Sequence, residues 1–179
     1  MLALAALAAC SSPEGAERVV EPRAFGGTAP RGPALLRQAM RQGHDAARAA
    51  VGLPPLVWSD ELAAGARAYA QTLAKTGRFA HSPESQALHR VGENLWTGTR
   101  GAYRYDEMIG HWVAERREYL HRPVPNFSRT GRWQDVAHYG QIVSRRTLRY
   151  GCALASNRRD DFLVCRYDPP GNLMGERVY

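Results

Sequence analysis

The sequence predicts an α+β domain in which helices cover an antiparallel sheet. Three stretches carry apolar residues at helical spacing, about 34–51, 59–77 and 102–119, and they precede the strand-like runs. Helices gathered in one part of a chain and strands in another are typical of this class, whereas strict alternation would predict a parallel sheet. A chain of 179 residues is long enough for one such domain with a buried core.

The first two predicted helices have clear ends. The first stops at Gly52-Leu53-Pro54-Pro55, because the residue before a proline avoids helical dihedral angles. Ser59 supplies an N-cap hydroxyl for the second helix, and Asp60 and Glu61 place negative charge in its first turn. Gly77 ends that helix in the usual position for a C-terminal glycine.

The third predicted helix leads into the region that carries the candidate site. Glu115 follows Trp112 by three residues, so we expect it at the edge of the packed face of this helix. An irregular stretch, 120–135, then leads to His138. Strand-like runs follow His138 and close the chain.

Two of these runs, 150–155 and 162–167, flank a polar turn and predict a hairpin. Cys152 and Cys165 lie symmetrically about the centre of the turn, so the hairpin would place them opposite each other. Opposed β-carbons lie about 4.5–5.5 Å apart, close to the spacing in a disulfide. We therefore predict a disulfide formed in an oxidising compartment. The alternative is a pair of reduced thiols in the core.

Residues 1–10 indicate the remnant of a signal peptide. Nine apolar residues precede Cys10, a run too short to span a bilayer as a helix. Leu7-Ala8-Ala9-Cys10 resembles the lipobox of bacterial lipoproteins, in which the cysteine is acylated, so we expect lipidation at Cys10. No Lys or Arg precedes the run, so either the true start lies upstream of Met1 or the signal is defective. The alternative is an accidental Ala-rich start on a cytosolic protein.

Residues 11–33 are rich in proline and glycine and predict a flexible linker to a single domain at 34–179. The formal net charge of +7 favours contact with anionic surfaces. Nucleic acid is not the expected partner, because the arginines are scattered and no nucleic-acid-binding module is recognisable.

Six short motifs occur in order along the predicted domain. They are His44-Asp45-Ala46-Ala47-Arg48, Gly52-Leu53-Pro54-Pro55-Leu56-Val57-Trp58, Gly92-Glu93-Asn94-Leu95, Trp112-Val113-Ala114-Glu115, Ala137-His138-Tyr139-Gly140-Gln141-Ile142-Val143 and Cys165-Arg166-Tyr167-Asp168-Pro169-Pro170-Gly171-Asn172. Together they resemble the CAP superfamily, which comprises cysteine-rich secretory proteins, antigen 5 and the plant pathogenesis-related proteins of group one. The resemblance covers about residues 35–179.

This resemblance implies a three-layer α-β-α sandwich with a central cleft lined by two histidines and two glutamates. By motif these side chains are His81, Glu93, Glu115 and His138. His89 is the alternative to His81, and Asn94 and Gln141 are expected to support the cleft. Gly140 stands where the family usually has Thr, Val or Ser, and Ser144 stands where it usually has Trp.

Two imidazoles and two carboxylates that converge on one cleft can coordinate a divalent metal, and zinc is the expected ion. A glutamate with a raised pKa could instead serve in general acid–base catalysis. No nucleophile setting and no His-Glu-x-x-His motif is present, so no residue is assigned as catalytic. In a purely structural alternative, Glu115 pairs with His111 and His138 is a hydrogen-bonded core residue. His44 and Arg48 are expected to brace the first helix.

We therefore expect an extracytoplasmic protein, either anchored to a membrane through Cys10 or secreted. The resemblance implies a cleft that binds an amphipathic small molecule, such as a sterol or a fatty acid, or a component of the cell envelope, without turnover. The competing hypothesis is a metal-dependent hydrolase of peptides or cell-wall material.

Overall fold

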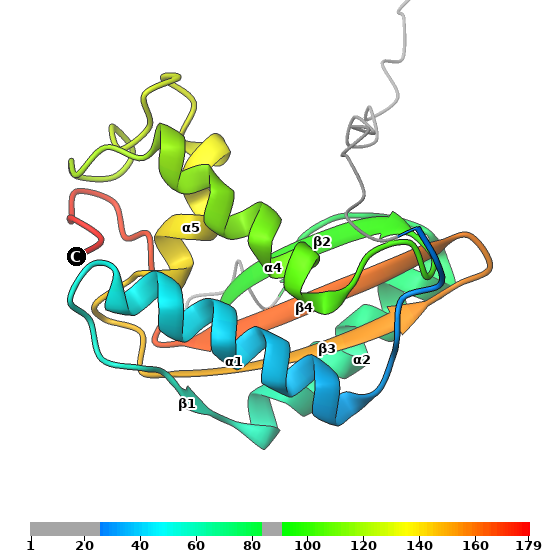
Figure 1. Ribbon diagram of the computed structural model, residues 1–179. Helices are drawn as coiled ribbons and strands as arrows, with labels where there is room; N and C mark the ends of the chain where they lie inside the picture. Colours follow the sequence, from blue (N-terminus) through cyan, green and yellow to red (C-terminus); the bar gives the residue numbers. More distant parts are fainter. Residues whose placement is uncertain (1–25, 84–90) are drawn as a thin grey trace, which may run out of the picture.

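The computed structural model describes residues 26–83 and 91–179 (Figure 1). The predictions for Cys10 and His89 concern residues outside these ranges. The elements, with η for 3-10 helices, follow in chain order as α1 (Pro33–Ala49), β1 (Val57–Trp58), α2 (Asp60–Thr76), β2 (Gly92–Thr99), α4 (Tyr105–Ala114), η1 (Glu115–Glu118), η2 (Trp133–Val136), α5 (Ala137–Ile142), β3 (Arg149–Ser156) and β4 (Asp160–Asp168).

The sheet has the strand order β1-β3-β4-β2 and lies between two layers of helices, which confirms the α+β sandwich. The pairs β3–β4 and β2–β4 are antiparallel as expected, but β1 pairs parallel with β3. The sheet is therefore mixed rather than purely antiparallel. Only Val57 and Trp58 form β1, and so short a strand carries no alternating pattern that could have revealed its direction.

Helix α2 covers one face of the sheet and begins and ends where the sequence predicts. The Ser59 hydroxyl accepts a hydrogen bond from Leu62 N at 3.2 Å, and Gly77 closes the helix with a φ of 67°. The backbone of α2 approaches β3 closely at Gly151. A β-carbon there would lie 2.3 Å from Ala63 N and 2.5 Å from Ser59 O, so this contact requires glycine.

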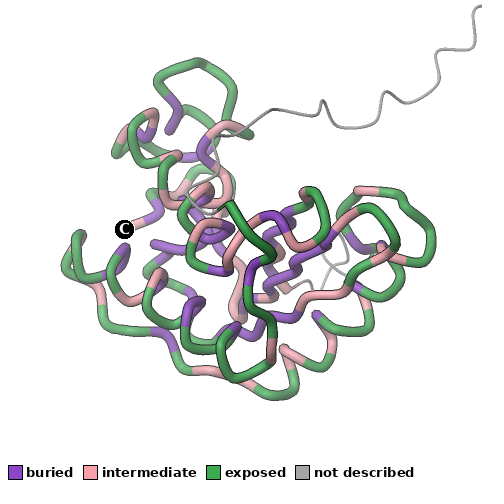
Figure 2. Tube along the Cα trace, turned by 45° about the vertical axis from the view of Figure 1, so that its right-hand side comes forward, coloured by how far each residue is buried: buried purple, intermediate pink, exposed green. Residues whose placement is uncertain are grey.

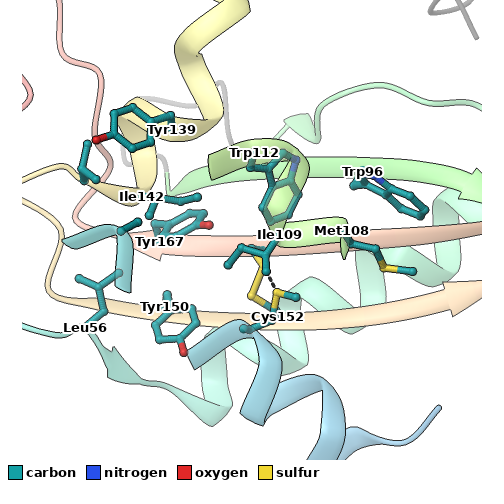
Figure 3. Close-up of a cluster of buried hydrophobic side chains, with 14 of the residues drawn as sticks. Leu56, Trp96, Met108, Ile109, Trp112, Tyr139, Ile142, Tyr150, Cys152 and Tyr167 are labelled. Atoms are coloured by element: carbon teal, nitrogen blue, oxygen red, sulfur yellow. Dashed lines mark hydrogen bonds between the residues drawn. A yellow bond between two sulfur atoms is a disulfide. The ribbon is translucent and has the colours of Figure 1, made fainter. Parts of the chain in front are cut away.

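Helices α1, α4 and α5 cover the other face, where the larger core lies (Figure 3). Buried segments gather along the sheet and on the inner sides of the helices, while the loops are exposed (Figure 2). Cys152 lies directly opposite Cys165 in the register of β3 and β4, and the two form a disulfide. The predicted hairpin and disulfide are both confirmed.

Two predicted elements differ from the structure. The third helix ends at Ala114 and continues as the 3-10 turn η1, instead of running from 102 to 119. The run that follows His138 is helix α5 and not a strand. Its side chains show why, because Tyr139, Ile142 and Val143 are fully buried and recur at helical spacing.

Arg48 holds α1 to two other parts of the chain, although its side chain lies in the core. It is 1% exposed, and its Nε donates a hydrogen bond to Pro54 O at 2.7 Å. Its Nη1 donates to Ile142 O at 3.0 Å and to Ser144 O at 2.8 Å. These bonds to carbonyls satisfy a charge that would otherwise be costly to bury. The brace expected at Arg48 is therefore present.

His44 is the second part of this brace and is fully buried. Its Nδ1 donates to Met40 O at 2.7 Å, so its Nε2 must accept the hydrogen bond from the Tyr167 hydroxyl at 2.9 Å. Burial lowers the pKa of His44 to about 4, and the nearby charge of Arg48 acts in the same direction. The imidazole is therefore neutral at physiological pH.

The chain before α1 packs on the sheet. Ala29 is buried, and its N–H donates to Gly101 O at 2.9 Å. Arg31 forms a salt bridge of 2.6 Å with Asp161, which is itself buried. The last residues of the predicted linker therefore contact the domain. Among the described helices, none is both long and apolar enough to cross a membrane.

Candidate functional site

The first half of the candidate site joins the segment after α2 to the start of β2. His81 Nδ1 and Ser82 N each donate to Glu93 Oε1, both at 2.9 Å. The Glu93 side chain is fully buried, whereas that of His81 is half-exposed. Arg166 is directly opposite Glu93 in the register with β4, and its Nε lies 3.8 Å from Glu93 Oε2. A buried carboxylate thus holds an accessible imidazole in one orientation.

Electrostatics keep this carboxylate ionised. Burial alone would raise the pKa of Glu93, but the hydrogen bonds from His81 and Ser82 outweigh it and leave the pKa below its ordinary value. Because an ionised carboxylate only accepts, His81 must carry its proton on Nδ1. The Nε2 lone pair of His81 then points away from Glu93.

The second half joins the end of α4 to the start of α5. His138 Nδ1 donates to Glu115 Oε1 at 2.6 Å, and Tyr139 N donates to Glu115 Oε2 at 3.0 Å. Trp112 stacks on the His138 ring with 5.8 Å between centroids and 15° between the planes. Glu115 therefore contacts His138, and not His111, which instead accepts a hydrogen bond from Trp96 Nε1 at 2.9 Å.

Asn94 connects the two halves. It follows Glu93 on β2 but faces the opposite side of the sheet, and its Nδ2 donates to His138 O at 3.1 Å and to the Tyr167 hydroxyl at 3.2 Å. Gln141 plays a different part, because its side chain accepts from Gly171 N at 2.9 Å and donates to Thr147 Oγ1 at 3.0 Å. Asn94 thus positions α5 against β2, and Gln141 holds the turn after β4.

The structure arranges the four predicted residues as two His–Glu pairs, His81–Glu93 and His138–Glu115. Over residues 26–83 and 91–179, no group of three or more His, Cys, Asp or Glu side chains is placed to hold a metal ion. A single cleft shared by all four side chains, and a metal within it, therefore stay predictions.

The Nε2 atoms of His81 and His138 are the ones that could bind a metal. Each glutamate occupies the Nδ1 side of its histidine, and neither Nε2 is hydrogen-bonded to another described residue. Histidine ligands typically donate their second ring N–H to a carboxylate in this manner. Each imidazole could therefore offer its Nε2 to a divalent ion, with its glutamate orienting the ring.

A second feature, which the sequence did not reveal, is an apolar hollow of about 360 Å³ between α1 and α4. Small side chains of α1 open it, and Ile109, Gly110 and Val113 of α4 form its other wall. A β-carbon on Gly43 would lie 2.8 Å from the side chain of Ile109, whereas one on Gly110 would meet no heavy atom within 4 Å. Ile109 therefore packs against α1 at Gly43, and the next residue, Gly110, faces open space.

Charged residues mark the rim of this hollow. Asp106 is engaged by Arg104, whose Nη2 lies 2.8 Å from its carboxylate. Arg116 is exposed at the η1 end and forms no salt bridge with any other residue in the described ranges. Tyr139 also lines this hollow. The hollow is therefore apolar inside and has Arg116, without a salt bridge to any described residue, at its rim.

A profile of the CAP family, described as the cysteine-rich secretory protein family, matches residues 42–167, which is more than half of the chain. The chain belongs to the CAP family. A pathogenesis-related protein of PR-1 type from Sambucus nigra is 39% identical to this CAP protein over 137 residues, which cover 76% of this chain and 77% of that protein. Pathogenesis-related protein 1C of Nicotiana tabacum is 36% identical over 137 residues, or 76% of each chain.

Solved CAP-fold structures agree with this assignment. The crystal structure of NaASP2 with Zn²⁺ has a TM-score of 0.66 and 21% identity, over 84% of this chain and 89% of that chain. The structure of BmVAL-1 has a TM-score of 0.64 and 22% identity, over 84% of each chain. At this level of identity the similarity establishes the fold alone.

Proposed function

We propose that this CAP domain is an extracytoplasmic, non-enzymatic binding protein that holds an amphipathic ligand with an aliphatic chain and an anionic head. The observation that carries the proposal is the apolar hollow between α1 and α4, which ends at an available arginine. Its volume falls within the range typical of small-molecule sites. The disulfide and the secretory character of the family support a location outside the cytoplasm, and acylation of Cys10 would add a membrane anchor.

The shape and charge of the hollow decide the ligand class. An aliphatic chain would lie on the alanines of α1 and on Ile109 and Val113, where contact with water is replaced by apolar contact. Arg116 would pair with a carboxylate or phosphate head group at the exposed end. A long-chain fatty acid such as palmitate meets both requirements.

Filling the hollow should weaken binding without harming the fold. Gly110→Leu places a side chain in the open space beside α4, so palmitate affinity should fall at least tenfold. The domain should not lose stability, because glycine is about 1 kcal/mol less favourable than alanine or leucine in a helix. Fluorescence displacement would measure the affinity and urea unfolding the stability.

Gly110→Ala is the matched control. It gains the same helical stabilisation but fills only the volume of one methyl group, so palmitate should still bind. Equal affinities of the parent and Gly110→Leu would reject the hollow as the ligand site. A folded parent that binds no labelled lipid would reject the ligand class itself.

The competing function is a metal-dependent hydrolase built on the two His–Glu pairs. Their accessible Nε2 atoms favour it, and the similar NaASP2 was solved with Zn²⁺. Bound zinc would act as a Lewis acid and lower the pKa of a coordinated water. In this chain His81 and His138 would provide the nitrogen ligands, while Glu93 and Glu115 would orient the two rings.

Zinc binding should require both histidines. His81→Ala and His138→Ala should each lower zinc affinity at least tenfold in calorimetric titration at neutral pH, because each removes one of two ligands. His121→Ala removes an exposed histidine and should leave affinity unchanged. The double variant should still bind palmitate. Hydrolysis of peptide or cell-wall material that survives in the double variant would exclude a hydrolase centred on these residues.

A further inference from the structure

Three arginines form an exposed cluster at one end of the sheet. Arg158 and Arg159 lie in the turn between β3 and β4, and Arg100 follows β2 at the same end. Arg100 N donates to Arg159 O at 2.8 Å, and Arg100 Nη1 donates to Asn157 O at 3.3 Å. These bonds fix the relative positions of the three residues, which we name the arginine tip.

Acidic residues offset this charge only in part. Asp161 is buried and neutralised by Arg31, so it offers no charge to the surface. Asp160 adjoins the turn and is partly exposed. Among the residues that the structure describes in these segments, the arginine tip therefore presents three guanidinium groups beside the one partly exposed carboxylate of Asp160.

The chain that leads into the domain arrives at the same end. Ala29 is bonded to Gly101, the neighbour of Arg100, and Arg31 is bonded to Asp161. In Figure 1 the blue start of the described chain lies beside the head of β2 and the orange turn, while the C-terminus lies at the opposite end. A tether upstream of residue 26 would therefore join the domain at the same end as the arginine tip.

We propose that the arginine tip is a docking surface for anionic phospholipid head groups. A single acyl chain binds membranes only marginally, and a basic surface is a common second contribution to stable attachment. Arginine suits this role because its planar guanidinium can bind phosphate through two hydrogen bonds. The proposal extends the membrane anchoring proposed above, but contact of the tip with lipid does not require acylation of Cys10. Attachment at this end would leave Glu93, at the other end of β2, away from the bilayer.

Vesicle co-sedimentation of the full chain carrying Cys10→Ser tests the tip without the acyl group. Vesicles of phosphatidylcholine, with and without one-third phosphatidylglycerol, are compared at low ionic strength. Each basic side chain near an anionic surface contributes about a fivefold gain in binding, so Arg100→Gln/Arg158→Gln/Arg159→Gln should lower partitioning about 100-fold. The loss should shrink at high salt, because screening weakens the contribution of the arginines.

A second triple variant at the opposite end is the matched control. Arg122, Arg145 and Arg177 are exposed, and the first and second lie close to the C-terminal segment through the bridge of Val124 with Met174 and the bond of Arg145 N to Val178 O. Their replacement by Gln removes the same charge, yet it should leave phosphatidylglycerol binding within about twofold. Equal losses in the two triple variants would mean that binding follows net charge alone and would overturn the proposal.

A double variant and a different anionic ligand give further tests. Arg158→Gln/Arg159→Gln changes only side chains of the turn, so a loss of vesicle binding in this folded double variant supports the tip even if the triple variant unfolds. Binding of the parent to a soluble anionic polysaccharide but not to vesicles would assign the tip to a polymer and overturn the membrane proposal. Gly110→Leu should not alter vesicle binding, so failure of the hollow and failure of the tip are distinguishable.

Discussion

Replacing Arg48 with methionine is expected to lower the free energy of unfolding by about 3–5 kcal/mol. The substitution leaves the carbonyls of Pro54, Ile142 and Ser144 without their donor. Ile142 and Ser144 are buried, and each buried acceptor that loses its partner costs about 1–3 kcal/mol, of which methionine recovers only part through apolar burial. Urea unfolding followed by tryptophan fluorescence would measure the change.

Two comparisons show whether the loss comes from these bonds. Arg41→Met alters an exposed arginine on the same helix, so the free energy of unfolding should change by less than about 0.5 kcal/mol. Arg48→Lys keeps the charge, but an ammonium group cannot reproduce the planar fork, so most of the loss should remain. A lysine variant as stable as the parent would show that the charge, and not the hydrogen-bond geometry, stabilises this site.

His44 is expected to make the domain less stable in acid by about 3 kcal/mol. Its pKa falls from 6.5 in the unfolded chain to about 4 in the fold, and one pH unit corresponds to about 1.36 kcal/mol. Between these two values the unfolded chain binds more protons, so stability rises with pH there. The full contribution is present above pH 6.5 and is lost as pH falls toward 4.

His44→Gln isolates this contribution from the carboxylates that also titrate in acid. Glutamine cannot take up a proton. The free energy of unfolding of the variant should therefore rise less steeply with pH across this window, by up to the slope that one bound proton produces. The measurement is the difference between the two unfolding free energies at pH 7 and at pH 5. If the difference is the same at both pH values, His44 is not buried in its neutral form.

Local chemistry made much of the fold predictable. Ser59, Gly77 and the two cysteines act through contacts with neighbours in the chain or across one turn, and such contacts are visible in the sequence. Helix α5 was mistaken for a strand because six residues are too few for the two periodicities to be told apart. Strand β1 is shorter still, and its parallel pairing depends on how α2 is seated on β3.

The candidate site was predictable only as a set of motifs. Glu93 and His138 stand in recognisable motifs. The pairing of Glu93 with Arg166, however, follows from the strand register, which cannot be derived from the sequence. The hollow was missed because small residues on α1 are equally typical of close helix packing. How closely two helices approach depends on their crossing, and Gly110 faces the open space beside α4.

The disulfide joins neighbouring strands of one sheet, and it closes a loop that the hairpin already defines. A bridge over a loop of this size restricts the unfolded chain by about 3 kcal/mol, but it links no helical layer to the sheet. Cys165 Sγ lies 3.9 Å from Met40 Sδ of α1, but α1 is also held by the hydrogen bonds of Arg48 and His44, which do not respond to thiols. Passage from an oxidising to a reducing compartment would therefore loosen one hairpin and leave the helices, and the hollow between them, in place.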